Sequence, residues 1–375
     1  MIALRKTTSA FGAELVEMDT EPTPREGEVV IAVAAAGICG SDIHAYEWTP
    51  GYEFMTAAMP LTIGHEFAGT VQALGADVTG FKVGDRVTCW PTVSCGHCPA
   101  CDAGTPEHCQ NRSIIGLHID GGFADRVRVP AINCRHIPDD LPFPVAALTE
   151  PLSVAVNAVD VGDIAPGDRV VVLGPGPIGL GIAFVAQTRG AKVLLCGLND
   201  GLRLDKGREI GIAHCVDLAE ESLTDAVQRV FGGPADRVIE ATGVARSVSD
   251  GLAVLRSGGV LVVAGIHSGH LDLDLTRFVR DKKQLRAAHD TTAQALANAI
   301  ALLAAHADVL ARLITHREPL SRAIEAFELA RSRQAVKVLL VPQPPSQDLP
   351  ERQDLPQTAD LPRTADLPQT ESELA

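Results

Sequence analysis

The sequence lacks any long uninterrupted apolar run. Its most apolar stretch, residues 170–186, is interrupted by Gly and Pro and is too short to cross a membrane. The N-terminal residues also lack the apolar core of a secretory signal. We therefore expect neither export nor a membrane partner.

Basic residues are scarce relative to acidic ones. The chain carries 32 Lys and Arg against 47 Asp and Glu, a formal net charge of −15. This balance disfavours sequence-independent binding to nucleic acid. Nine cysteines without an export signal indicate a reducing compartment, where thiols bind metals or pack rather than form disulfides. We expect a cytoplasmic protein.

The character of the chain changes along its length, which predicts two domains and a tail. Short strand-like runs fill the first 150 residues, whereas apolar runs alternate with helical segments from about residue 165, the pattern of a doubly wound parallel (Rossmann) sheet. After residue 285 the chain is mostly helical, and the last apolar run, 335–341, is expected to return to the N-terminal domain as a strand. Residues 343–375 contain four hexapeptides built around Asp-Leu-Pro. We expect a disordered repeat tail there, with a docking motif as the alternative.

Four cysteines in residues 95–109 form the most distinctive motif. Two residues separate each of the first three, and seven precede the fourth. Four thiolates in a tight loop match the tetrahedral coordination of a structural zinc ion. A disulfide knot is disfavoured because three cysteines this close cannot pair comfortably. The predicted ligands are Cys95, Cys98, Cys101 and Cys109.

Residues 174–179 read Gly-Pro-Gly-Pro-Ile-Gly, a G-x-G-x-x-G sequence that follows an apolar strand and opens a helix. Gly174 permits a tight turn, Gly176 lets the backbone approach a pyrophosphate, and Gly179 permits close helix–strand packing. The helix N-terminus, with Pro177 and Ile178, would face the phosphates. We predict that NAD or NADP binds here.

The residue that normally selects NAD is absent from its usual place. An acidic side chain at the end of the next strand would hold the ribose hydroxyls, but that strand ends at Gly197. Asn199 or Asp200 could bend back to take this role. Arg203 could favour a 2′-phosphate or lie on a solvated helix face. The choice between NAD and NADP stays open, with NAD favoured.

A second set of metal-ligand residues is spread over more sequence. Cys39, His65, Glu66 and Glu150 together offer a thiolate, an imidazole and one or two carboxylates. Such a mixed set leaves a coordination position for water or substrate, as a catalytic zinc requires. Each residue alone has an ordinary structural explanation, so the prediction depends on their coming together.

With these motifs in this order, the chain resembles the zinc-containing medium-chain dehydrogenase/reductase family, and most nearly its sorbitol (polyol) and L-threonine dehydrogenase branch. The matching segments are GICGSDIH at 37–44, GHEFAGTVQALGADVTGFKVGDRV at 64–87, the Cys₄ lobe, TEPLSVAVNAV at 149–159, GPGPIG at 174–179 and EATG at 240–243. The resemblance implies a β-rich GroES-like catalytic domain (1–155 and 290–342) around a Rossmann domain (156–289). It also implies one catalytic and one structural zinc ion per chain, and a homodimer or homotetramer.

The resemblance assigns the four dispersed residues to the catalytic zinc, with either Glu66 or Glu150 as the direct carboxylate ligand and the other orienting a water. Ser41 and His44 match the hydroxyl and imidazole of a proton relay. The implied reaction is hydride transfer between a secondary alcohol, held as a zinc-bound alkoxide, and NAD(P), or the reverse reduction of a ketone.

The substrate is the least constrained part. The polyol branch carries an arginine that contacts substrate hydroxyls near the start of the C-terminal catalytic segment. The nearest counterpart here is Asp290, which weakens the expectation of a sugar alcohol and admits an amine-bearing or cyclic alcohol. Residues 45–60 would form either a flap over the substrate or ordinary packing. The alternatives are an aldehyde-adduct dehydrogenase of the zinc branch, a zinc-free quinone or enone reductase, which the cysteine lobe opposes, and a non-catalytic nucleotide-binding protein.

Overall fold

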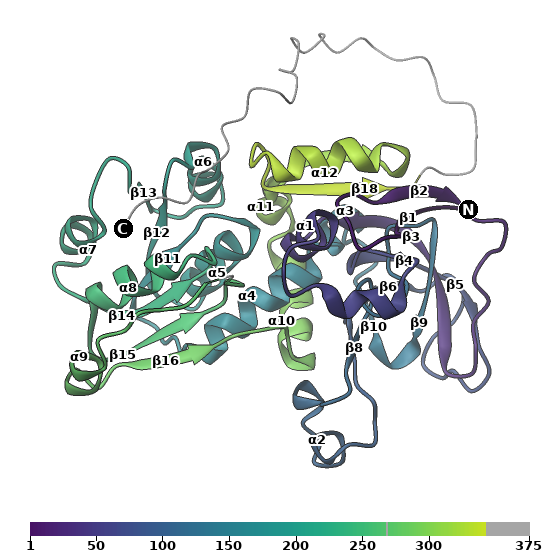
Figure 1. The fold of residues 1–375 in the computed structure, drawn as a ribbon, viewed down its shortest axis with the longest axis horizontal. Coiled ribbons are helices and arrows are strands. Elements are labelled where there is room, and N and C mark those ends of the chain that lie inside the picture. The colour runs from purple at the N-terminus through teal and green to yellow at the C-terminus, as the bar shows by residue number, and fades with distance from the viewer. Residues whose placement is uncertain (268, 343–375) are drawn as a thin grey trace, which may run out of the picture. The chain divides into compact units, whose positions relative to one another are not determined.

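The computed structural model describes residues 1–267 and 269–342, which belong to one unit (Figure 1). The repeat tail expected at 343–375 lies outside the described residues. Two main sheets organise the unit: a mixed sheet built largely from the N-terminal part and a parallel sheet built from the middle of the chain. This arrangement confirms the predicted α/β class.

The mixed sheet has seven strands, and two of them, β17 and β18, come from the C-terminal segment of the chain. Its path is β10-β6-β5-β3-β18-β17, with β9 paired to β3. β18 runs antiparallel to β3, which confirms that the last apolar run returns to the N-terminal sheet. The strands are β3 (Glu28–Gly37), β5 (Glu66–Leu74), β6 (Arg86–Cys89), β9 (Arg126–Pro130), β10 (Cys134–His136), β17 (Ile314–Pro319) and β18 (Lys337–Val341).

Two smaller sheets lie in the N-terminal part. A three-stranded sheet has the order β2-β1-β4, and a two-stranded sheet pairs β7 with β8 beside the cysteine lobe. Their strands are β1 (Ile2–Lys6), β2 (Glu14–Glu17), β4 (Leu61–Thr62), β7 (Thr92–Val93) and β8 (Ser113–Ile114).

The parallel sheet has six strands in the order β13-β12-β11-β14-β15-β16, and every pairing is parallel. The order reverses direction at β11, so the carboxyl ends of β11 and β14 flank the switch point where such folds bind ligands. The strands are β11 (Arg169–Leu173), β12 (Lys192–Gly197), β13 (His214–Asp217), β14 (Ala235–Glu240), β15 (Leu255–Val263) and β16 (Gln284–Ala287). The connecting helices are α5 (Pro177–Thr188), α6 (Gly201–Glu209), α7 (Leu223–Phe231), α8 (Ala245–Val254) and α9 (Leu275–Arg280).

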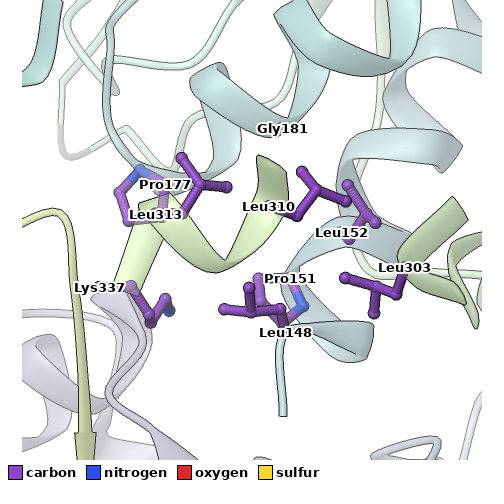
Figure 2. Close-up of a pocket in the computed structure, with 9 residues that line it drawn as sticks. All are labelled: Leu148, Pro151, Leu152, Pro177, Gly181, Leu303, Leu310, Leu313 and Lys337. Carbon is purple, nitrogen blue, oxygen red and sulfur yellow. The ribbon is translucent and has the colours of Figure 1, made fainter. Parts of the chain in front are cut away.

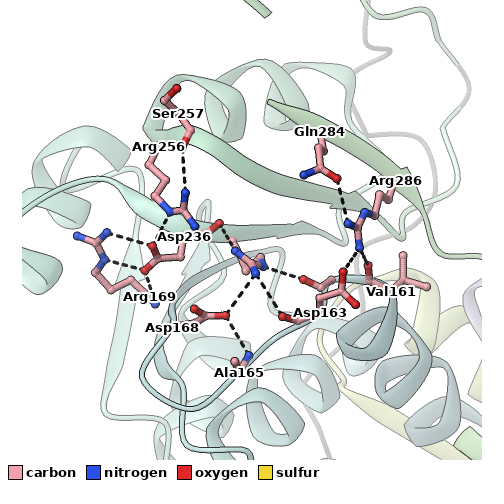
Figure 3. Close-up of polar contacts among 12 residues, drawn as sticks. Val161, Asp163, Ala165, Asp168, Arg169, Asp236, Arg256, Ser257, Gln284 and Arg286 are labelled. Atoms are coloured by element: carbon pink, nitrogen blue, oxygen red, sulfur yellow. Dashed lines mark hydrogen bonds and ion pairs between the residues drawn. The ribbon is translucent and has the colours of Figure 1, made fainter. Parts of the chain in front are cut away.

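One carboxylate ties three strands together at the edge opposite that switch point (Figure 3). Asp236, near the start of β14, accepts hydrogen bonds from Arg169 Nε at 2.8 Å and from Arg256 Nε at 2.7 Å. Hydrogen bonds from Arg169 and then Arg256 hold the pKa of Asp236 well below its usual range, against the opposing effect of burial. The amino-terminal ends of β11, β14 and β15 are thereby joined.

Helices connect the two main sheets through a continuous hydrophobic core. Residues of α4, α5 and α10 share one cluster with Val170 and Val172 of β11 and with Ala68 of β5. No single helix among the described residues is long and apolar enough to span a membrane. One bent pair of helices, Ala293–Ala305 and Ala307–Leu313, meets the length and apolarity of a span only when the two are counted together. The remaining helices are α1 (Gly40–Glu47), α2 (Pro99–Asp102), α3 (Phe143–Ala146), α4 (Thr149–Val161), α10 (Ala293–Ala305), α11 (Ala307–Leu310) and α12 (Ala323–Arg331), with 3₁₀ turns η1 (Glu53–Ala58), η2 (Pro106–His108), η3 (Ala131–Asn133), η4 (Ala311–Leu313) and η5 (Leu320–Arg322).

Candidate active site

Three strands of the mixed sheet meet at the first site residues. Glu66 begins β5 opposite Gly37, the last residue of β3, and Leu339 of β18 pairs with Gly37 from the other side. A Cβ at residue 37 would lie 2.2 Å from Glu66 Oε2, so any residue larger than glycine would displace this carboxylate. The buried Glu66 carboxylate accepts two hydrogen bonds from Lys337 Nζ, at 2.8 and 2.6 Å, and Lys337 also donates to the Ile38 carbonyl at 3.0 Å. Glu66 and Lys337 thus form a fully buried ion pair.

Cys39 is the N-cap residue of α1, and the first turn of this helix positions His65. Asp42 accepts a hydrogen bond from the Cys39 N–H at 2.9 Å, which caps the helix. The other carboxylate oxygen of Asp42 lies 3.5 Å from His65 Nδ1, and both side chains are buried. Ser41 Oγ lies 3.3 Å from the opposite ring nitrogen, His65 Nε2. The imidazole is therefore held between a carboxylate and a hydroxyl.

The surroundings of His65 fit a metal ion. Burial disfavours a charged imidazole, but the charges of Asp42 and Cys39 outweigh it and raise the pKa of His65 well above its usual value. Even so, His65 Nδ1 and Asp42 Oδ1 are buried without a regular hydrogen bond to any described residue. A metal ion bound through Nε2 would leave Nδ1–H to donate to Asp42, the usual second partner of a metal-binding histidine. Thiol, imidazole and carboxylate are also donor types that zinc accepts.

Glu150, in the first turn of α4, lies within electrostatic range of His65, although among the described residues only the four cysteines of the lobe bring their metal-ligating atoms within 4.8 Å of one another. Burial raises the pKa of Glu150 to about 8; His65 partly offsets this effect, whereas Glu66 and Asp290 add to it. A bound cation would stabilise the charged carboxylate in this position. Within the described part of the chain, Glu66 is paired with Lys337 and no salt bridge involves Glu150. Glu150 is therefore the more available of the two carboxylates.

His44 lies on α1 but has a different partner. Its Nδ1 lies 3.2 Å from Thr49 Oγ1, and its ring centroid lies 5.7 Å from that of Tyr52. Within the described part of the chain, Ser41 approaches His65, and no hydrogen bond joins Ser41 to His44. The predicted relay therefore stays a prediction.

The four clustered cysteines converge in a lobe formed around α2 and η2. Their sulfur atoms all lie within 4.8 Å of one another, and all nine cysteines of the chain are free. Backbone N–H groups stabilise the thiolate forms: they lower the pKa of Cys98 to about 6 and lower that of Cys109 as well. Burial instead raises the pKa of Cys101 to about 11. Four convergent sulfurs, two of them stabilised as thiolates, fit a closed zinc site.

The glycine turn after β11 has the shape that a dinucleotide needs. Gly174 has φ of +100°, and a Cβ on Gly179 would lie 1.8 Å from the Gly174 carbonyl oxygen. Gly176 caps α5 and would leave open space even with a Cβ, so its backbone is approachable. Pro177 and Ile178 form the first turn of α5, where free N–H groups point outward. These residues fit the pyrophosphate of NAD(P).

A small apolar pocket lies between the start of α5 and the buried Glu66–Lys337 ion pair (Figure 2). It borders both Pro177 of α5 and Lys337 of the buried ion pair. Its lining comes from α4, α5, α10, α11 and η4, and comprises Leu148, Pro151, Leu152, Pro177, Gly181, Leu303, Leu310, Leu313 and Lys337. The two parts of the candidate site are therefore neighbours.

The residues after β12 have separate contacts. Asn199, at φ of +53°, donates its backbone N–H to Asp217 Oδ1 at 2.9 Å. Asp200, rather than Asn199, bends its side chain back over Gly197, since a Cβ on Gly197 would lie 3.0 Å from Asp200 Cβ. Arg203 donates two hydrogen bonds to the Ala335 carbonyl, each 3.3 Å long, so its guanidinium is not merely solvated.

Asp290 lies beside the metal donors and is itself paired. It accepts a hydrogen bond from Thr92 Oγ1 at 2.5 Å and lies 4.0 Å from Arg112 Nη1. Its charge contributes to the raised pKa of Glu150, which places it near that carboxylate. The Asp290 carboxylate therefore lies within electrostatic range of Glu150, and the Arg112 guanidinium lies next to Asp290.

The segment 45–60 is partly core. Tyr46 and Met55 are buried in the cluster of the mixed sheet, and the Tyr46 hydroxyl donates to Glu328 Oε1 at 3.1 Å. Phe54 is 44% exposed and stacks on His118 with 4.7 Å between centroids. The packing alternative therefore applies to Tyr46 and Met55, and Phe54 is the residue of this segment left for a flap.

Sequence reasoning missed three buried charged residues of the site. Asp42 positions His65, Lys337 holds Glu66, and Glu240 accepts hydrogen bonds from Gly243 N–H at 3.0 Å and from His267 Nε2 at 2.8 Å, beside the glycine turn. A signal existed for each: Asp42 stands three residues after Cys39, Lys337 is the single charge of the apolar strand β18, and Glu240 directly follows the buried Val238 and Ile239 at the end of β14. A charge in such a place needs a buried partner.

Two family models match the chain in succession. The model described as alcohol dehydrogenase GroES-like domain covers residues 25–139, and the model described as glucose dehydrogenase C-terminus covers residues 143–341. Together they span most of the described residues, and the junction between them falls just before α3.

Curated proteins and solved structures show similarity over nearly the whole length. A sorbitol dehydrogenase from Halalkalibacterium halodurans is 36% identical over 346 residues, covering 91% of this chain and 99% of that protein. An L-threonine 3-dehydrogenase from Deinococcus radiodurans is 32% identical over 343 residues, covering 91% and 97%. A zinc-binding dehydrogenase structure from Sinorhizobium meliloti 1021, bound to NADP, has a TM-score of 0.81 and 31% identity, covering 91% and 99%.

Proposed function

The chain belongs to the zinc-containing medium-chain dehydrogenase/reductase family, an NAD(P)-linked group of alcohol dehydrogenases, and from this premise we propose that it oxidises a secondary alcohol at Cys39, His65 and Glu150. The observation that carries the proposal is the orientation of His65. Asp42 takes one ring nitrogen and leaves the other beside Ser41, so a metal ion and a substrate hydroxyl would meet there. A nucleotide-binding protein without catalysis would not need this arrangement.

The two glutamates have different roles in this proposal. Glu150 is the direct carboxylate ligand, because Glu66 is already held by Lys337. A zinc ion held by Cys39, His65 and Glu150 would supply a Lewis acid that lowers the pKa of the substrate hydroxyl. Glu66 fixes the position of Lys337, which lines the apolar pocket together with Pro177 of the nucleotide turn.

The chain's own groups move the proton. Ser41 Oγ stands at the ring nitrogen that would face the metal, so it accepts the proton released by the substrate hydroxyl. His44 lies on the same helix, is hydrogen-bonded to Thr49, and passes the proton towards solvent. NAD(P), bound at Gly174–Gly179, supplies the hydride acceptor.

The wider organisation follows the same proposal. Residues 1–155 with 290–342 form the catalytic domain and residues 156–289 the dinucleotide domain, with α4 crossing the boundary. The four clustered cysteines hold a structural zinc ion. We place the enzyme in the cytoplasm as a homodimer or homotetramer, which the nine free thiols and the family membership support.

The substrate class is a polyol-like, amine-bearing or cyclic secondary alcohol. Asp290 and Arg112, 4.0 Å apart beside the metal donors, favour a substrate with several polar or charged groups over a simple aliphatic alcohol. Asp290 suits an ammonium or hydroxyl group, and Arg112 suits a carboxylate. The related sorbitol and L-threonine dehydrogenases are named for substrates of both types.

The test is turnover by the full-length, zinc-loaded protein with NAD⁺ and with NADP⁺. The substrates are polyols, threonine and other amino alcohols, cyclic alcohols and, as a comparison, simple aliphatic alcohols. We expect turnover on at least one polar class, and none from the Cys39→Ser variant assayed in parallel. Two zinc ions per chain with no turnover on any alcohol would contradict the proposal.

A further inference from the structure

Asp200 occupies the place that a selecting residue at the end of β12 would fill. A Cβ on Gly197 would lie 2.9 Å from Pro175 Cγ and 3.0 Å from Asp200 Cβ. The space that a side chain at residue 197 would need is therefore occupied by Pro175 and Asp200. The Asp200 carboxylate stands about 20 residues after the fingerprint, where a residue that reads the adenosine ribose is expected.

Two arginines hold this carboxylate. Arg333 Nη2 lies 3.2 Å from Asp200 Oδ2, and Arg203 Nη1 lies 3.9 Å from Asp200 Oδ1. Arg203 belongs to α6, whereas Arg333 lies between α12 and β18, more than a hundred residues later in the sequence. The Asp200 side chain is only 9% exposed, while that of Arg333 is 67% exposed. Arg203 also reaches the Ala335 carbonyl, so both parts of the chain are joined here.

The backbone around Asp200 is held in place. Asp217, at the end of β13, accepts hydrogen bonds from the N–H groups of Ala219 and Asn199, which lower its pKa. Asp217 also brings a second negative charge. With Asp200 and Asp217 against Arg203 and Arg333, the charges around this point balance, and no surplus positive charge remains for a phosphate.

From these contacts we propose that Asp200 makes the enzyme selective for NAD. Its carboxylate pairs with Arg203 and Arg333, the two groups that could otherwise bind the 2′-phosphate of NADP, so that phosphate finds no cationic partner here. The inference rests on the proposed function in that a dinucleotide binds at Gly174–Gly179. NAD presents hydroxyl groups, which can donate to the Asp200 carboxylate without disturbing the arginines. NADP places about two negative charges beside the same carboxylate. Removing the charge of Asp200 releases two guanidinium groups, a favourable phosphate site.

The test measures binding and does not depend on turnover. Dissociation constants of NADH and NADPH are determined by fluorescence titration of the full-length, zinc-loaded protein and its variants. We expect the unmodified protein to bind NADH at least tenfold more tightly than NADPH. Asp200→Asn should tighten NADPH binding about tenfold or more, and Asp200→Ser, which keeps a hydroxyl for the ribose, should do the same. Adding Arg333→Gln to Asp200→Asn should remove the gain.

A matched control and the opposing outcomes complete the experiment. Asp205→Asn removes a carboxylate from the same helix, where Asp205 is 68% exposed and paired with Arg208, and should leave the NADH/NADPH ratio unchanged. Preference for NADPH in the unmodified protein, or no tightening of NADPH in either Asp200 variant, would overturn the inference. Alcohol turnover that prefers NADP⁺ to NAD⁺ would overturn this inference and leave the proposed function standing, whereas selective NADH binding without any turnover would overturn only the proposed function.

Discussion

Among single residues, Asp42 joins the capping of α1 to the orientation of His65. One oxygen accepts from the Cys39 N–H and the other faces His65 Nδ1, so the positions of the thiol and the imidazole depend on the same side chain. Because the group is fully buried, its charge is balanced within the site rather than by water. A change here should alter metal affinity before it alters the fold.

Asp42→Asn should weaken zinc binding at the catalytic site by about 10- to 100-fold. The amide oxygen can still cap α1, but the amide nitrogen would face His65 Nδ1 in place of an acceptor. Zinc affinity is measured by competition with a chelator, together with kcat. Asp205→Asn is the control, and equal zinc affinity in both variants would refute the positioning role of Asp42.

Cys39→Ser and His65→Ala test the ligands themselves. Each should abolish turnover and reduce the zinc content from two ions per chain to one, because a hydroxyl or a methyl group does not replace a thiolate or an imidazole as a zinc ligand. NADH binding, followed by fluorescence, should persist because the glycine turn lies on a different element. Full activity in either variant would remove that residue from the metal site.

At the scale of elements, the cysteine lobe depends on its metal more than on its packing. Its two short helical segments, α2 and η2, contribute no buried residue of their own, so little apolar burial holds the lobe in shape. Cys98→Ser should lose one zinc ion per chain and lower Tm by several degrees, while residual protein retains catalytic zinc and nucleotide binding. A normal melting curve with unchanged zinc content would disprove the structural role.

The strands of the parallel sheet are joined at their amino-terminal ends by Asp236. Because Arg169 and Arg256 lower its pKa, the stabilisation is fully present above the unfolded-state pKa of about 3.9 and is lost as the pH falls through the lower folded-state value. Asp236→Asn should cost about 1–2 kcal/mol, after allowance for the partial exposure of the arginines. The Tm difference from the unmodified protein should stay constant between pH 8 and pH 5 and shrink below about pH 4. A difference that grows on acidification would contradict this.

For the molecule as a whole, local patterns predicted the elements and the return of the last strand to the N-terminal sheet, but not the long-range contacts between charged side chains. The cysteine spacing and the glycine turn specified their own geometry, because each is complete within a few residues. The alternation after residue 165 likewise predicted the parallel sheet. The Lys337–Glu66 pair and the Arg333–Asp200 contact could not be located, since each joins residues more than a hundred positions apart. Only the pairing of β18 with β3 and the docking of the segment after α12 bring these charges together.

The limits of the functional unit follow from the same long-range contacts. β18 ends at Val341, and every candidate metal, relay and nucleotide residue precedes that point. The family match also ends at residue 341. A chain truncated after Pro342 should therefore keep kcat and KM within about twofold and melt at the same temperature. Truncation after Gln334 is the contrasting variant: it removes Lys337 and the central strand β18, leaves the Glu66 carboxylate buried without its cation, and should fail to fold into active enzyme. A large loss of turnover in the first variant would assign a function to residues 343–375, and activity in the second would refute the role of β18.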